Sequence, residues 1–98
     1  MAMLKHIVLF KFKPTATPAQ RQELAAALNA LPAMIADIKG WQVVASVPGR
    51  PERYAHLALF SEFDDVAALD RYIVHPQHKK IVELVEAYCE SRASFDYV

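Results

Sequence analysis

Apolar residues along the chain follow two kinds of pattern, and the first kind predicts four β-strands. Residues 5–12, 41–47, 54–61 and 93–98 concentrate β-branched and aromatic side chains between Pro, Gly or polar positions. Short runs of this kind are typical of strands. In the first and third runs both alternating sets of side chains are apolar at the centre, so we expect the sheet to be covered on both faces.

The second kind of pattern places apolar residues three and four positions apart and predicts three helices. Thr17 begins the first helix with a T-x-x-Q capping box, and Leu24 and Leu28 belong to its buried stripe. Asp64 is expected to cap the second helix. A third helix is expected after His75, because the proline that follows this residue disfavours helical geometry at it.

The resulting order, β-α-β-β-α-α-β, predicts an α+β fold: a ferredoxin-like four-stranded antiparallel sheet with helices on one face. The chain is short enough to form a single domain over residues 1–98. The open face is expected to carry Ile7, Leu9, Leu57 and Leu59, which together are too apolar to face water. We therefore expect a homodimer, a dimeric α/β barrel in which two sheets pack face to face.

Composition narrows the classes of function. Hydrophobic residues make up 54% of the chain, which agrees with apolar surface buried between subunits. Eleven basic and eleven acidic residues form no basic stripe, so no nucleic-acid partner is expected. No apolar run approaches the ~20 residues of a membrane span, so no membrane partner is expected. A single cysteine and no visible secretory signal favour a cytoplasmic protein.

Several side chains are predicted to gather between the sheet and the helices. His6 shares one face of the first strand with Val8 and Phe10, and His56 shares one face of the third strand with Ala58. All five are expected to line a pocket on the helix-covered side of the sheet, together with Leu24, Leu28 and His75.

Three more residues are expected to supply chemistry to that pocket. His78 lies on the buried stripe of the third helix, Tyr72 lies on the inner face of the second, and Asp96 lies on the last strand. A histidine oriented by a carboxylate, with a phenol nearby, forms a plausible acid/base set. The alternative is that the histidines are structural, because a histidine on an apolar face often only bridges two elements by hydrogen bonds.

Metal binding is a third interpretation of the histidines. His75 and His78 are three residues apart, and His6 and His56 could complete a site. The break at Pro76 disturbs the helical spacing, and no carboxylate is grouped with the histidines in sequence. Glycine-rich phosphate loops and cofactor motifs are also missing. We therefore expect no metal and no cofactor.

The sequence resembles the stress-responsive α/β-barrel domain family, known as Dabb. The matching segments are residues 6–12 (HIVLFKF), 72–78 (YIVHPQH) and 95–97 (FDY). The resemblance implies a dimeric barrel. One plant member closes a linear polyketide by aldol condensation without a metal or cofactor. Similarity to this cyclase implies that Tyr72 and His78 are the acid/base residues and that Asp96 is the partner of His78. It also implies that His6 corresponds to the histidine on the first strand of the cyclase.

The pocket wall departs from that cyclase. Leu24 and Leu28 stand where the cyclase has aromatic groups, and Ala58 replaces a larger valine. The resemblance therefore implies a different ligand, and two hypotheses follow. One is cofactor-independent acid/base chemistry on a small carbonyl or polyketide-like molecule. The other is a non-catalytic stress-response or ligand-binding protein.

Overall fold

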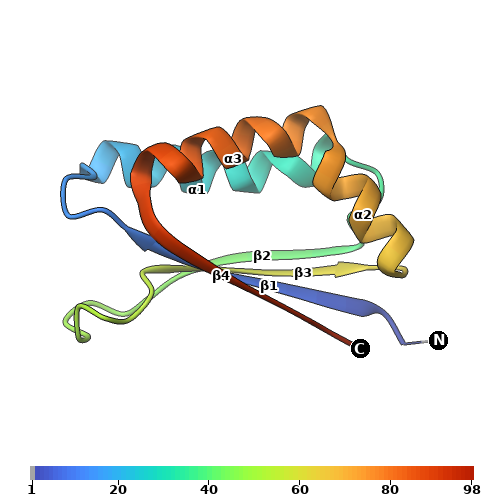
Figure 1. Cartoon of the computed structure of the whole chain (residues 1–98), viewed down its shortest axis with the longest axis horizontal. Helices are drawn as coiled ribbons and strands as arrows, with labels where there is room; N and C mark the ends of the chain where they lie inside the picture. Colours follow the sequence, from blue (N-terminus) through green and yellow to red (C-terminus); the bar gives the residue numbers. More distant parts are fainter. Residues whose placement is uncertain (1) are drawn as a thin grey trace.

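Helices cover one face of a four-stranded sheet and leave the other face open (Figure 1). The computed structural model describes residues 2–98. Its elements in chain order are β1 (Leu4–Phe12), α1 (Pro18–Ala30), the 3-10 turn η1 (Leu31–Ala33), β2 (Gly40–Ala45), β3 (Leu57–Phe63), α2 (Val66–Val74), α3 (Pro76–Tyr88) and β4 (Cys89–Tyr97).

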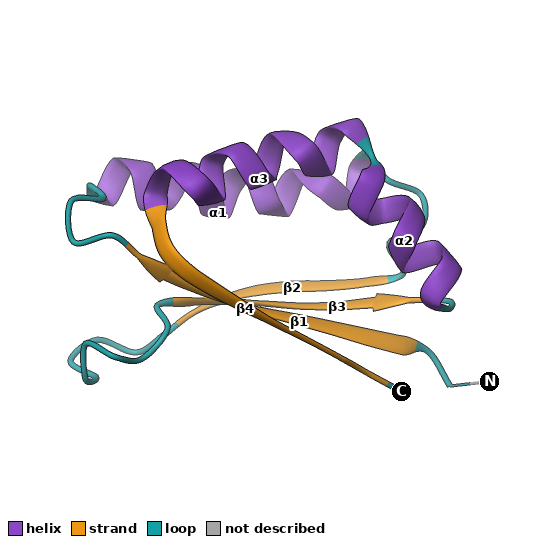
Figure 2. Cartoon of the chain, in the orientation of Figure 1, coloured by secondary structure: helices purple, strands orange, loops and turns teal. Residues whose placement is uncertain are grey.

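The strands run in the order β2-β3-β1-β4, and every neighbouring pair is antiparallel. Helices α1 and α3 lie side by side above the sheet, and α2 descends at one end (Figure 2). The predicted α+β, ferredoxin-like fold is therefore confirmed. No helix among residues 2–98 is long and apolar enough to cross a membrane.

Local capping signals set the helix boundaries. The predicted capping box is present, because Thr17 Oγ1 accepts from the Gln20 N–H at 3.2 Å and Gln20 Oε1 accepts from the Thr17 N–H at 2.9 Å. The cap of α2 is Asp65, whose carboxylate accepts from the Ala68 N–H at 2.9 Å. The prediction of Asp64 was wrong by one position, because two adjacent aspartates offer the same capping chemistry and only the path of the chain selects between them.

His75 separates α2 from α3, as its position before a proline predicts. Its backbone is extended, and its Nδ1 accepts a hydrogen bond from the Gln77 N–H at 3.1 Å. The side chain of His75 therefore caps the start of α3.

The two faces of β1 match the prediction, whereas those of β3 are reversed. Val8 is buried beneath the helices and pairs with Leu59, which is 1% exposed. Leu9 faces outward and pairs with Ala58. Leu57 and Leu59 therefore belong to the core, and their expected place on the open face was wrong. Since both alternating sets in β3 are apolar, sequence alone could not set the phase.

The open face is apolar even without Leu57 and Leu59. Exposed hydrophobic side chains on the strands include Leu9, Val44, Phe60, Phe95 and Tyr97. Phe60, for example, is 43% exposed. The sheet therefore presents a broad apolar surface on the side away from the helices.

Candidate functional site

A cavity of about 170 Å³ lies between the sheet and helices α2 and α3. Its lining residues come from strands β1, β3 and β4 and from helices α1, α2 and α3: His6, Val8, Phe10, Leu28, Leu59, Tyr72, Ile73, His78, Ile81, Val82, Val85, Arg92 and Ser94. The structure thus brings His6, Tyr72 and His78 around one space.

The imidazole of His78 is held in one tautomer. Its Nδ1 lies 2.9 Å from the carbonyl oxygen of Ile73. A carbonyl can only accept, so Nδ1 carries the proton and Nε2 keeps its lone pair. Burial lowers the pKa of His78, the hydrogen bond to the Ile73 carbonyl offsets part of this effect, and the nearby positive charge of Arg92 lowers the pKa further. At neutral pH His78 is therefore an uncharged base with Nε2 as its accepting atom.

Tyr72 supplies a protonated hydroxyl next to this base. The ring centroids of Tyr72 and His78 are 4.5 Å apart, and the tyrosine is only 2% exposed. Burial raises the pKa of Tyr72 well above its ordinary value, so the phenol stays protonated. Rings of Phe63 and Trp41 pack on it at centroid distances of 4.9 and 6.1 Å. No hydrogen bond to the Tyr72 hydroxyl is found within residues 2–98, so this donor is available to a ligand.

Asp96 pairs with His6 and not with His78. The two residues stand opposite each other in the β1–β4 register, and the Asp96 carboxylate accepts a hydrogen bond from Nδ1 of His6. The implied pairing of Asp96 with His78 was therefore wrong. The reason is geometric: the neighbouring strand brings Asp96 directly across from His6, while His78 is already bonded to the backbone of α2.

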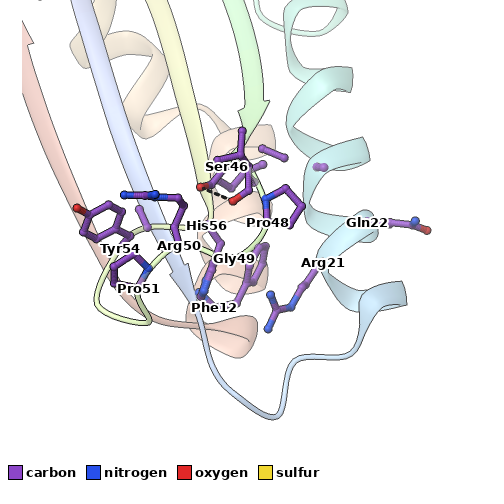
Figure 3. A pocket seen from close by; sticks show the side chains of 15 residues that line it. Phe12, Arg21, Gln22, Ser46, Pro48, Gly49, Arg50, Pro51, Tyr54 and His56 are labelled. Carbon is purple, nitrogen blue, oxygen red and sulfur yellow. Dashed lines mark hydrogen bonds between the residues drawn. The ribbon is translucent and has the colours of Figure 1, made fainter.

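Four predicted pocket residues lie outside this cavity. Leu24 is fully buried in the core beneath α1, and His75 serves as a helix cap. Ala58 faces the open side of the sheet opposite Leu9, so its expected place in the pocket was wrong. His56 precedes β3 and lines a different, larger cavity of about 500 Å³ near Phe12 (Figure 3). Only the tertiary path of the β2–β3 connection separates His56 from the other histidines.

Sequence reasoning missed two polar lining residues, Arg92 and Ser94. They stand opposite Phe10 and Val8 in the β1–β4 register, on the helix-facing side of β4 together with Asp96. Polar residues at every second position in the last strand were a usable signal, since Ala93, Phe95 and Tyr97 alternate with them. A strand with its polar side turned inward indicates a polar wall in the cavity.

Metal-binding side chains do not cluster in the part of the chain that the structure describes. No three His, Cys, Asp or Glu side chains among residues 2–98 lie close enough to share an ion. His75 Nδ1 is engaged with the Gln77 N–H, and His78 Nδ1 with Ile73.

Sheet order and cavity together define a ferredoxin-like α+β protein with a histidine- and tyrosine-lined space beneath its helices. The chain belongs to the Stress responsive A/B Barrel Domain family, Dabb, whose sequence model matches residues 4–98. It is similar to olivetolic acid cyclase of Cannabis sativa, with 30% identity over 98 residues that cover 96% of this chain and 94% of the cyclase.

Two solved structures of ferredoxin-like proteins are similar over almost the whole chain. A dimeric protein from Bacteroides fragilis is 33% identical with a TM-score of 0.81, covering 97% of this chain and 94% of its own. A dimeric protein from Thermobifida fusca is 25% identical with a TM-score of 0.87, covering 100% and 92%. These comparisons confirm the predicted family and fold.

Proposed function

We propose that this protein is a homodimer whose cavity catalyses proton transfer at the carbon next to a carbonyl group of a small, largely apolar molecule. The observation that carries the proposal is the pairing of His78 with Tyr72. One offers an unprotonated Nε2, and the other offers a protonated hydroxyl with no partner within the described chain.

Each residue has a defined part in this chemistry. His78 Nε2 removes a proton from the carbon next to the carbonyl, and the electron pair of the C–H bond becomes the enolate. The Tyr72 hydroxyl donates a hydrogen bond to the oxygen on which negative charge develops, and Arg92 stabilises that charge from β4. The enolate carbon can then attack a second carbonyl of the same molecule, and the resulting alkoxide takes the proton back from His78. Similarity to a cyclase supports this assignment.

The homodimer forms through the open face of the sheet. Exposed Leu9, Phe60 and Phe95 form a patch on a single face, and a symmetric pair of sheets removes it from water. The two similar solved structures are dimeric.

Deuterium exchange into acetophenone in D₂O, followed by proton NMR, tests the catalytic proposal. Cavities of about 150 Å³ hold benzene, so the ring of this ketone suits the site. Exchange at the methyl group should be faster with protein than without. His78→Asn should slow the protein-dependent exchange by roughly 10²- to 10⁴-fold, and Tyr72→Phe should slow it as well.

The matched control is His75→Asn. It makes the same change three residues away, outside the cavity, and asparagine is itself a favoured helix cap. His75→Asn should keep exchange at the wild-type rate. Wild-type protein without any effect on exchange, or equal rates for the two asparagine variants, would defeat the proposal.

The second candidate is a non-catalytic ligand-binding protein with structural histidines. The bond from His78 Nδ1 to the Ile73 carbonyl favours it, because this bond ties α3 to the end of α2. In that case His78→Asn should lower stability by about 0.5–1.5 kcal/mol, the usual net contribution of one hydrogen bond, with no turnover to lose. Thermal melting measured beside exchange separates the two candidates.

A further inference from the structure

The larger cavity, of about 500 Å³, is separate from the His78 site. It lies where β1 ends and β3 begins, between the first turns of α1 and the β2–β3 connection (Figure 3). No residue lines both cavities. Its volume is within the range of small-molecule sites, about 300–1,000 Å³. The proposed proton transfer makes no use of it.

His56 presents a fixed hydrogen-bond donor in this cavity. Its backbone N–H donates to the Phe10 carbonyl at 2.8 Å, and its Nδ1 accepts from the Phe12 N–H at 3.0 Å. The ring also stacks on Phe12 with centroids 6.0 Å apart. Because Nδ1 accepts a hydrogen bond, the ring proton is on Nε2. No partner for Nε2–H is found among residues 2–98.

Arg21 adds a positioned positive charge. Its Nε donates to the Ala16 carbonyl at 3.3 Å, and its guanidinium carbon lies 4.9 Å from the centre of the Phe12 ring. Figure 3 shows the side chain extending from α1 toward Phe12. Within the described chain no carboxylate pairs with this guanidinium, so its terminal nitrogens are available as donors.

The charge of the cavity is positive and uncompensated. Arg50 also lines it, above the ring of Tyr54 at 5.4 Å, and no Asp or Glu does. The remaining wall is largely apolar and includes Ala25, Ala45, Val47, Pro48, Pro51 and Leu57. Such a cavity suits a molecule with one anionic end and an apolar body.

We propose that this cavity is a second binding site, for an organic acid. The planar guanidinium of Arg21 binds the carboxylate through two parallel hydrogen bonds, the geometry for which arginine is suited. His56 Nε2–H gives a second donor of fixed direction, and Arg50 adds charge from the β2–β3 connection. The apolar body lies against the prolines and alanines of the wall, which distinguishes an organic acid from free phosphate.

Titration with 2-naphthoate and 2-naphthamide, followed by two-dimensional amide NMR, tests the proposal. The two probes have nearly the same shape and differ in charge. Naphthoate should bind at least about tenfold tighter, the usual effect of a hydrogen bond to a charged group. Shifts should centre on the amides of Ala45, Gly49 and His56. Arg21→Gln should remove the preference for naphthoate, and Arg21→Lys should keep part of it.

Two further variants make the test specific. Arg71→Gln removes the same charge from the exposed face of α2 and should leave naphthoate binding unchanged. His56→Asn keeps an acceptor for the Phe12 N–H but lacks the Nε2 donor, so it should weaken naphthoate binding while a dispersed amide spectrum shows that the fold is kept. Equal affinity for the two probes, wild-type binding by Arg21→Gln, or displacement of naphthoate by an equal concentration of inorganic phosphate would overturn the proposal. Shifts centred on Tyr72 and His78 would overturn it as well.

Discussion

Replacing Phe60 by lysine should separate the proposed dimer without unfolding the subunit. Phe60 lies on β3 with its side chain on the open face, and 43% of its surface is exposed in the single chain. Phenylalanine has about 200 Å² of surface to bury, so dimerisation would remove roughly 85 Å² per subunit. At about 25 cal/mol per Å², the two symmetric copies together contribute on the order of 4 kcal/mol.

A loss of this size corresponds to roughly a thousandfold weaker dimer, before the repulsion of two facing lysines is added. Sedimentation velocity at protein concentrations of about 1 to 100 μM should show a dimer for the wild type and a monomer for Phe60→Lys. Thermal melting should confirm that the variant is still folded.

Two control variants distinguish loss of the dimer from loss of the fold. Val74→Lys changes an exposed apolar residue of α2, which is 63% exposed and lies away from the open face, so it should leave the dimer intact. Leu57→Lys changes the core beneath the helices and should prevent folding, because an unpaired charge would be buried. A Phe60→Lys variant that remains as dimeric as Val74→Lys would refute the proposed interface.

Two other predictions concern charge and capping. Because burial and Arg92 hold the pKa of His78 below its ordinary 6.5, the folded state binds fewer protons there than the unfolded state. Stability should therefore fall as pH drops below 6.5, as thermal melts should show, and Arg92→Met should raise the pKa of His78 in an NMR titration. Asp65→Ala should cost about 1 kcal/mol in urea unfolding through loss of the α2 cap, whereas Asp64→Ala should cost much less.

Features that depend on neighbours along the chain could be predicted from the sequence. The capping box at Thr17 and the break between His75 and Pro76 follow from local hydrogen bonding and from the fixed geometry of proline. The order and type of the elements followed from these signals together with the spacing of apolar residues. This information was sufficient to predict the fold. His6, Tyr72 and His78 could be assigned to one side of the sheet for the same reason.

Features that depend on pairing between distant segments were decided only by the tertiary structure. The phase of β3 was ambiguous because both of its faces are apolar, and the register with β1 turned Leu59 inward and Ala58 outward. From the sequence alone, Asp96 could pair with either His6 or His78, and the β1–β4 register places it opposite His6. His56 reached a separate cavity because the β2–β3 connection folds back on Phe12. Periodicity in a sequence assigns residues to a common face, whereas the register between strands far apart in the chain determines which side chains meet.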